Sequence, residues 1–431
     1  MRVLPIAVLL LTLPVAAQAL QPEVLWKEEF PDCPGSGFVH LVPIEGKDNA
    51  ALLVVRTPER WSLYEVRAQG VTHLGDVSLG TPRSTAVEGA AYLPDRGELL
   101  IAAVVGEEEA GPAGCALAVS LRRSGTDVRR FDGPYLAARP CPDGTVLALL
   151  YEGHEFLEDK GVHRYTLTLT RLHPDGRAER LVTFEVLSTL PPGTVSIPGT
   201  LRIEPFGDGY LITGSGLVGL VELRRTASGW EPDCIIPPDN FGRERPVQYF
   251  QNSVVLDPSE RLILARVAEI ANPEIGDWVV CRPSPQGGVP EELRRVNLGE
   301  ILSFLQTGVR LRVDGMVYRV VPAIGPSSAE LLILGSGTTQ VWEVPGFQEL
   351  AVTPRLYGVR VSENGAGGCT VEVCAFKPSR SEEWLAPLFG GAGEGTGERR
   401  VRGRESRRGE GGKSGGVMVV PAVPPRRPRR S

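Results

Sequence analysis

The chain contains 431 residues, of which 42% are hydrophobic and 23% are charged. This balance is typical of a folded globular protein and excludes a wholly disordered chain. Residues 391–431 hold 11 Lys and Arg against 4 Asp and Glu, which leaves 35 against 48 in residues 1–390, from totals of 46 and 52. The body therefore carries a net charge near −13. A body of this charge repels nucleic acid, so we expect no nucleic-acid partner for it.

The first 19 residues have the pattern of a secretory signal peptide. A single positive charge at Arg2 precedes an apolar stretch from Val3 to Val15, and Ala17-Gln18-Ala19 supplies the small residues of a cleavage site. The apolar stretch is shorter than the roughly 20 residues that cross a bilayer. We therefore predict that residues 1–19 are removed and that the protein has no transmembrane segment. We expect it to be exported to the periplasm, the cell surface or the medium.

Short apolar runs separated by turn residues recur along the body, and long helical periodicity is nearly absent. Runs of this kind, bounded by Gly, Pro and Asp, are typical of antiparallel strands. One turn recurs around an aspartate, at Asp48, Asp95, Asp143, Asp208 and Asp257. The separations of 47, 48, 65 and 49 residues predict a structural repeat of about fifty residues.

A second turn follows each of these aspartates and ends in glycine, at Gly70, Gly125, Gly176, Gly229 and Gly287. Asp and Pro favour the first positions of such turns, and Gly favours the position with positive φ. Two hairpins per repeat give four strands per unit. Because one such unit cannot cover both of its faces, neighbouring units must stack. The sequence therefore predicts an all-β domain over residues 20–389, a β-propeller of six or seven four-stranded antiparallel blades.

Over roughly residues 45–350 the chain resembles the broad group of NHL, TolB-like and gluconolactonase-like propellers. The resemblance rests on Leu93-Pro94-Asp95, Pro142-Asp143-Gly144 and Leu256-Asp257-Pro258, where a strand runs into a turn of the P-D-G type. It implies the propeller architecture and does not by itself imply a reaction.

Seven cysteines in an exported chain favour disulfides, and the odd count leaves at least one cysteine outside an internal pair. Propellers commonly close their ring by pairing N-terminal with C-terminal strands. Because Cys33 lies near one end of the predicted domain and Cys369 and Cys374 lie near the other, a covalent ring closure is one hypothesis. Two further pairs would be neighbours within or between units: Cys115 with Cys141, and Cys234 with Cys281. The alternative is that several of these cysteines are small buried hydrophobic residues.

Residues 390–431 are rich in Gly, Arg, Glu and Ser and end in a Pro/Arg run. This composition cannot bury enough apolar area to offset the entropy of ordering, so we expect a disordered basic tail. A functional interpretation is a tether to an anionic surface. The alternatives are a solvated tail or the product of a frameshift in a GC-rich gene.

The sequence contains no compact metal-ligand or catalytic motif such as H-E-x-x-H, G-x-S-x-G or a P-loop. The histidines are His40, His73, His154, His163 and His173. His154 lies within an acidic stretch, Gly153 to Gly161, which we expect to be a loop, and His163 lies just after it. That loop is either a metal site or simply solvated.

Two fragments keep an enzyme hypothesis open. Asn252 lies where gluconolactonase-like propellers place an inward Asn before a blade strand, and Glu88 resembles the E-G segment of some propeller esterases and phytase-like proteins. In such families, carboxylates and amides from separate blades converge at the central channel, where they bind Ca²⁺ and the metal polarises the substrate. The alternative is that Glu88 and Asn252 are polar residues at strand starts.

These observations favour an exported propeller that serves as a binding or scaffold module for a protein, peptide or glycan, without a cofactor. The rival hypothesis is a metal-assisted hydrolase of the lactonase or phosphoesterase type, with Glu88 and Asn252 as Ca²⁺ ligands. A third is a surface component held by the basic tail.

Overall fold

The computed structural model describes residues 20–378, apart from gaps at 59, 79–83, 107–113, 196–199, 285–287, 297–303, 307, 314–315, 325–327, 336–338 and 365–366. The chain divides after Ala392 into two compact units, and all described residues belong to the first. The predicted signal peptide, residues 1–19, and the predicted tail, residues 390–431, lie outside the described residues.

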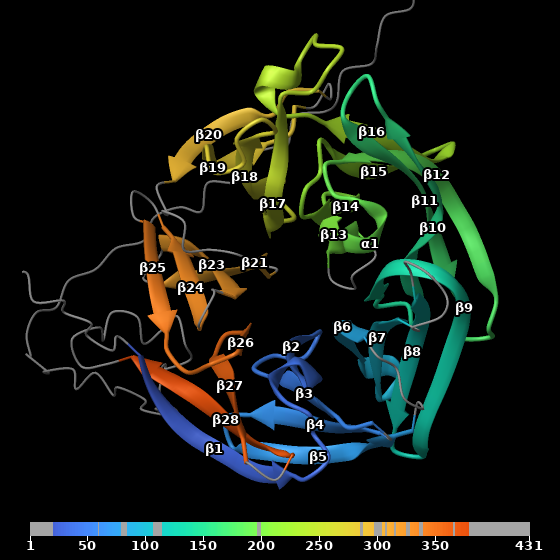
Figure 1. Ribbon diagram of the computed structural model, residues 1–431. Coiled ribbons are helices and arrows are strands. Elements are labelled where there is room, and N and C mark those ends of the chain that lie inside the picture. The colour runs from blue at the N-terminus through green and yellow to red at the C-terminus, as the bar shows by residue number, and fades with distance from the viewer. Residues whose placement is uncertain are drawn as a thin grey trace, which may run out of the picture. The chain divides into compact units, whose positions relative to one another are not determined.

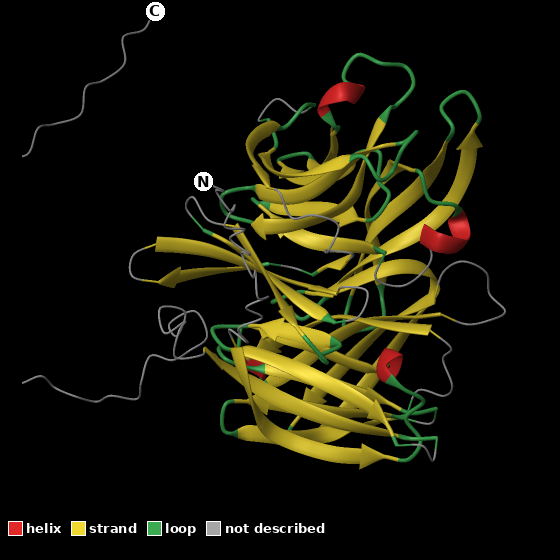
Figure 2. Cartoon of the chain, turned by 60° about the vertical axis from the view of Figure 1, so that its left-hand side comes forward, coloured by secondary structure: helices red, strands yellow, loops and turns green. Residues whose placement is uncertain are grey.

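Nearly all the regular secondary structure in the described part of the chain is strand, which confirms the all-β class (Figure 2). The short helical segments are α1 (Pro192–Val195), η1 (Ser36–Phe38), η2 (Pro94–Arg96) and η3 (Pro238–Asn240). None of the helices in the described ranges has the length and apolar character needed to cross a membrane.

The first part of the chain forms one eleven-stranded sheet. Its strands are β2 (Val39–Glu45), β3 (Ala51–Arg56), β4 (Trp61–Arg67), β5 (Gly70–Val77), β6 (Ser84–Leu93), β7 (Glu98–Gly106), β8 (Gly114–Arg122), β9 (Gly125–Pro140), β10 (Val146–Leu157), β11 (Val162–Leu172) and β12 (Ala178–Ser188). A short parallel contact, Ile44 with Ala90 and Glu45 with Ala91, joins β2 to β6. The long strand β9 pairs with β8 through its first part and with β10 through its last part, so it ends one four-stranded unit and begins the next.

The rest of the chain forms separate sheets. The next two are β13 (Leu201–Phe206), β14 (Gly209–Gly214), β15 (Leu220–Thr226) and β16 (Gly229–Ile235), and then β17 (Gln248–Asp257), β18 (Leu262–Glu269), β19 (Gly276–Arg282) and β20 (Glu291–Val296). A five-stranded sheet follows, with β21 (Phe304–Leu305), β22 (Val309–Val313), β23 (Met316–Ile324), β24 (Ala329–Leu334) and β25 (Thr339–Val344). The last sheet contains β26 (Glu349–Val352), β27 (Leu356–Glu363), β28 (Cys369–Pro378) and the first strand, β1 (Leu20–Phe30).

The sheets lie around a ring in chain order, and β1 lies beside β28 where the ring closes (Figure 1). The pairing of β1 with β28 is antiparallel and extends from Leu20 opposite Pro378 to Phe30 opposite Cys369. This is the architecture of a β-propeller. The number of blades, six or seven, stays a prediction.

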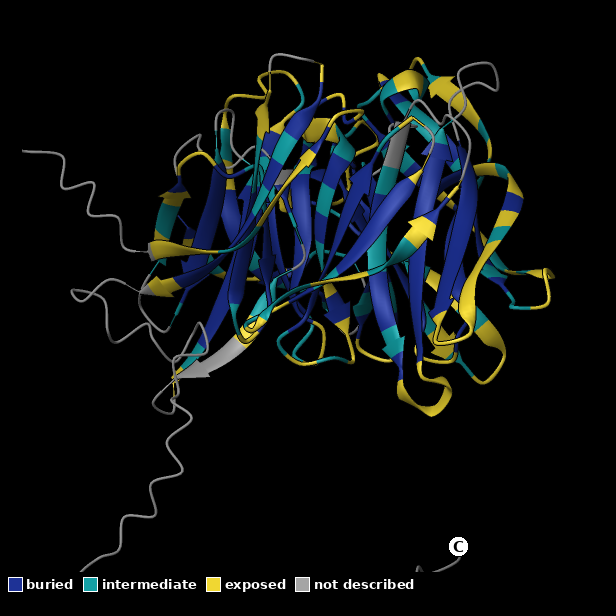
Figure 3. Ribbon diagram, turned by 90° about the horizontal axis from the view of Figure 1, so that it is seen from below, coloured by how far each residue is buried: buried dark blue, intermediate teal, exposed yellow. Residues whose placement is uncertain are grey.

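The core lies between neighbouring sheets rather than at one centre. Leu264 and Trp278, for example, pack in one cluster with Leu332 and Leu334 of the following sheet. Buried residues fill the middles of the strands, and exposed residues gather at their ends (Figure 3). Each sheet thus covers a face of its neighbours, as stacking units require.

Two of the five predicted aspartate turns, at Asp143 and Asp257, have the expected local chemistry. Asp143 Oδ1 accepts hydrogen bonds from the backbone N–H of Thr145 (2.9 Å) and from its hydroxyl (2.6 Å), and Gly144 takes a φ of 85°. Asp257 Oδ1 accepts the same two bonds from Ser259, at 3.0 and 2.6 Å. In the turns at Asp143 and Asp257, the aspartate side chain therefore accepts hydrogen bonds that hold the turn in place.

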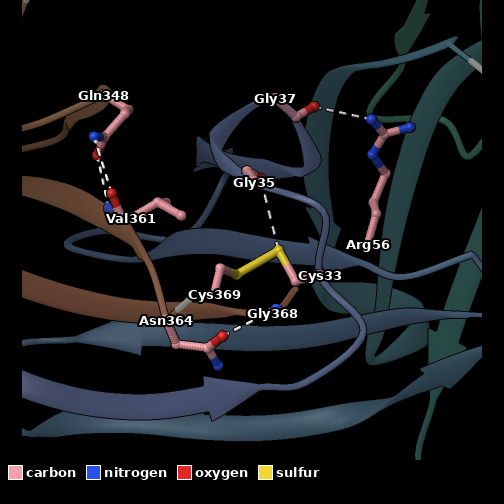
Figure 4. Close-up of a disulfide and its surroundings, with 9 residues drawn as sticks. All are labelled: Cys33, Gly35, Gly37, Arg56, Gln348, Val361, Asn364, Gly368 and Cys369. Atoms are coloured by element: carbon pink, nitrogen blue, oxygen red, sulfur yellow. Dashed lines mark hydrogen bonds between the residues drawn. A yellow bond between two sulfur atoms is a disulfide. The ribbon is translucent and has the colours of Figure 1, made fainter. Parts of the chain in front are cut away.

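One disulfide, Cys33–Cys369, joins the segment after β1 to the start of β28, which confirms the hypothesis of a covalent ring closure (Figure 4). Cys369 shares its face of β28 with Val371 and Val373, which pack toward the first unit of the ring, whereas Cys374 packs in the cluster on the opposite face. Because successive side chains of a strand point to opposite faces, Cys374 is directed away from Cys33.

The two other cysteine pairs are not formed. Cys115 packs in the apolar cluster between the first two units, and Cys141 packs in the cluster around β10 to β14. These two cysteines therefore face different spaces between sheets. Cys281 is a buried thiol and Cys234 an exposed one.

Candidate functional site

The two predicted metal ligands lie on different sheets. Glu88 is in the middle of β6, at an irregularity in its pairing with β7, and Asn252 follows a similar irregularity in β17. Asn252 is buried, and neither residue is at a strand start. Within the described ranges, no three His, Cys, Asp or Glu side chains gather in an arrangement that could hold a metal ion. The Ca²⁺ site therefore stays a prediction.

The prediction of a loop from Gly153 to Gly161 is wrong, because β10 continues to Leu157 and β11 begins at Val162. The acidic residues occupy the tight turn and the end of a long hairpin. Pairing across this hairpin brings the rings of His154 and His163 to 6.1 Å, and His154 Nδ1 lies 2.6 Å from the hydroxyl of Tyr151. Partial burial and the nearby charge of His154 lower the pKa of His163. The two histidines form part of an aromatic group rather than a cluster of metal ligands.

A pocket of about 200 Å³ lies on one face of the sheet β17–β20. The strand register forms its floor and one side of its rim. Phe250 pairs with Val267 in the floor, and Val267 pairs with Asp277 at the rim, so the three side chains share one face. Val279 and Cys281 continue that face along β19. The same face packs against the preceding sheet, where Phe250 and Cys281 share a cluster with Leu220 and Ile235.

The connection from β16 to β17 supplies the roof of the pocket. The side chain of Asn240 folds it back, since its Oδ1 accepts the backbone N–H groups of Val247 (2.8 Å) and Gln248 (2.9 Å) and its Nδ2 donates to the Gln248 carbonyl (2.8 Å). This fold places Pro238 and Asp239 over the floor. Gln248 Nε2 then donates to Asp239 Oδ2 at 2.8 Å, which holds the roof to the first residue of β17.

The rim of the pocket is acidic. Among the residues that the structure describes, it carries the carboxylates of Asp239, Glu269, Asp277 and Glu292 and one cation, Arg295. Arg295 is already paired with Asp277 and with Glu292, the latter at 2.8 Å. In the part of the chain that the structure describes, Asp239 and Glu269 have no basic side chain within ion-pair distance. These two carboxylates flank Gln248. Asp239 accepts a hydrogen bond from its side chain, and Glu269 is its cross-strand partner.

Cys281 at the floor is a thiol at neutral pH. It is 2% exposed, and burial, with a smaller contribution from the charge of Glu292, raises its pKa to about 12. Since the thiolate is the reactive form of cysteine, this residue is not suited to act as a nucleophile. The arrangement of an apolar floor under a charged rim is suited to binding.

None of the pocket residues was predicted from the sequence as part of a site, and Cys281 was named only as a candidate disulfide partner of Cys234. They come from four strands and three connections, and no short motif spans them. The run Pro237-Pro238-Asp239-Asn240 is the one local signal, because two prolines and two residues that favour turns mark a structured connection.

No protein-family model matches the chain, and no curated protein matches its sequence. Among solved structures, the β-propeller domain of Cps50 (Swd1) from Myceliophthora thermophila has 12% identity and a TM-score of 0.44, with 82% of this chain and 99% of that chain covered. The WD40 domain of SCAP from fission yeast has 9% identity and a TM-score of 0.43, with 80% and 83% covered. A proposed 6-phosphogluconolactonase from Bacteroides uniformis has 15% identity and a TM-score of 0.40, with 71% and 85% covered. We carry no activity over from these proteins.

Proposed function

We propose that this protein is an exported β-propeller that acts as a binding module, and that the pocket on the β17–β20 sheet receives part of a protein, peptide or glycan partner. The observation that carries the proposal is the preformed pocket itself, with an apolar floor and a rim of polar groups held by hydrogen bonds. Concave apolar sites with a few fixed polar groups are where proteins usually bind ligands.

Export is supported by the pattern of residues 1–19 and by the disulfide Cys33–Cys369, because disulfides persist in oxidising compartments. The test is to express the full chain and a chain that lacks residues 2–19, and to compare their fractionation. We expect the full chain outside the cytoplasm with a mature N-terminus at Leu20. Retention of the full chain in the cytoplasm, with its N-terminus intact, would contradict export.

Binding through the pocket is tested by site-specific photo-crosslinking. A photoreactive amino acid replaces Ile275, which lines the pocket and is 54% exposed, and in a control it replaces Val128 on β9, which is 37% exposed. We expect a discrete adduct from position 275 and not from position 128. The adduct should be lost when Val267→Phe narrows the floor. Equal adducts from both positions, or an adduct indifferent to Val267→Phe, would count against the pocket.

A further inference from the structure

We propose that the group received by this pocket is a basic side chain, lysine or arginine, presented by a partner protein or peptide. The inference rests on the proposed binding function and goes further by naming the chemistry of the occupant. Three properties of the pocket carry it: its size, the position of its charges and the distribution of its apolar residues.

Size favours a single side chain. Pockets that bury drug-sized ligands measure roughly 300–1,000 Å³, whereas this one measures about 200 Å³. A protein partner that inserts one long side chain fits this volume, because the remainder of the partner stays outside. The exposed side chain of Ile275 at the rim offers such a partner an apolar contact.

Charge favours a cation. The described lining residues include four carboxylates and one guanidinium, and that guanidinium is paired with Asp277 and Glu292. This excess of negative charge would repel an anion. A neutral apolar group would desolvate the carboxylates of Asp239 and Glu269 without a partner, which is costly. An ammonium or guanidinium group supplies donors and no acceptors, so it matches these two carboxylates.

The apolar residues account for the rest of a basic side chain. Phe250, Val267 and Val279 lie along the floor, and Asp239 and Glu269 lie at the end where Gln248 begins β17. Lysine and arginine carry an apolar stem and a charged head, and they pack the stem on apolar surface while the head stays among polar groups. The net charge of the body, near −13, attracts basic partners over a longer range.

The experiment uses two probe peptides, Gly-Gly-Lys-Gly-Gly and the same peptide with norleucine in place of lysine, both acetylated and amidated. Saturation-transfer NMR with the mature full-length protein reports ligand protons that contact the protein, and titration gives the affinities. Norleucine keeps the alkyl stem and removes the charge. We expect the lysine peptide to bind about tenfold more tightly, and its stem protons to receive the strongest saturation.

Two matched variants locate the effect. Glu269→Gln removes one rim charge, and Glu158→Gln removes one exposed charge from the turn between β10 and β11, outside the pocket. We expect Glu269→Gln to weaken binding of the lysine peptide about tenfold, which corresponds to 1.4 kcal/mol, and Glu158→Gln to change it less than twofold. Unchanged thermal melting of both variants shows that the fold is retained.

Equal affinities for the lysine and norleucine peptides, or equal losses in the two variants, would overturn the inference. Its failure is separable from failure of the proposed function. A pocket-dependent adduct at position 275 without any preference for lysine leaves a binding module with a different occupant, whereas loss of the adduct as well removes the pocket as a binding site.

Discussion

The hydroxyl of Tyr357 donates a 2.9 Å hydrogen bond to the carbonyl oxygen of Asn49, 308 residues earlier in the chain. Tyr357 lies on β27 of the last sheet, and Asn49 lies in the turn between β2 and β3 of the first unit. At the same junction between the last sheet and the first unit, Glu349 Oε2 accepts a hydrogen bond from the backbone N–H of Leu41 at 2.6 Å. Side-chain bonds between the last sheet and the first unit therefore accompany the β1–β28 pairing and the disulfide in closing the ring.

Removal of the disulfide should lower stability without opening the ring, because the β1–β28 pairing remains. We expect the Cys33→Ser, Cys369→Ser variant to lose about 2–5 kcal/mol of unfolding free energy, since the bond closes a loop of 336 residues. Urea titration measures the loss, and Cys234→Ser is the control. Peptide mapping without reduction should recover Cys33 linked to Cys369, and a different partner for Cys33 would contradict the structure.

Removal of the Tyr357 hydroxyl should have a smaller effect. Tyr357→Phe keeps the buried ring but leaves the Asn49 carbonyl without this donor, so we expect a loss of about 1 kcal/mol of unfolding free energy. Tyr151→Phe is the matched control, because its hydroxyl meets the exposed ring of His154, and we expect a change within about 0.5 kcal/mol. Urea denaturation measures both variants. Equal losses of unfolding free energy in Tyr357→Phe and Tyr151→Phe would contradict a stabilising role for the Tyr357–Asn49 hydrogen bond in ring closure.

Asp257 should be the most sensitive of the turn aspartates. It is 2% exposed, and its Oδ2 lies 2.9 Å from Nη2 of Arg319 on the next sheet. Burial raises the pKa of this carboxyl, but hydrogen bonds from Ser259 and Glu260 and the charges of Arg319 and Arg310 outweigh it and lower the pKa below its ordinary value. Its contribution is therefore present above the ordinary pKa of an aspartate and is lost as the pH falls through the lowered one.

We expect Asp257→Asn to cost about 3 kcal/mol of unfolding free energy at pH 7. This is the low end of the range for breaking a buried pair, because Glu260 remains 2.9 Å from Arg319 Nη2. Asp175→Asn is the control, since Asp175 serves only an exposed turn, where it accepts the N–H of Arg177 at 3.0 Å. Chemical denaturation at pH 7 compares them, and similar costs would show that the contact between sheets adds little.

Glu330 should make stability depend on pH in the opposite sense. Its carboxyl is buried on β24, and burial, with a smaller contribution from the charge of Glu343, raises its pKa to about 7. The folded state then retains a proton that the unfolded state releases above the ordinary pKa of about 4.5. The unfolding free energy therefore falls as the pH rises from about 4.5 to 7 and then levels off.

Glu330→Gln removes this penalty. We expect the unfolding free energy of the variant to exceed that of the unmodified protein by about 1–3 kcal/mol at pH 8, and to be nearly equal to it at about pH 4, below the ordinary pKa. Denaturation at the two pH values provides the measurement. A constant difference between the two proteins at both pH values would exclude titration of Glu330 as the cause.

The sequence by itself determined the fold class and the repeat, because the chemistry that specifies them is local. An aspartate that satisfies its own turn, as Asp143 and Asp257 do, and a glycine that takes a positive φ, as Gly144 does, need only a few neighbouring residues. The last of the recurring aspartates is Asp257, and beyond it the local pattern does not show that the last sheet takes its fourth strand from the other end of the chain.

The tertiary structure decided which of two candidate cysteines meets Cys33, and it decided where the pocket lies. Alternation along β28 puts Cys369 and Cys374 on opposite faces, so the choice depended on which face the first unit covers. The pocket required Gln248 and Glu269 to become cross-strand partners and Asn240 to fold the preceding connection over them. Such neighbours are far apart along the chain and are brought together only by strand register and sheet packing, which a single sequence does not specify.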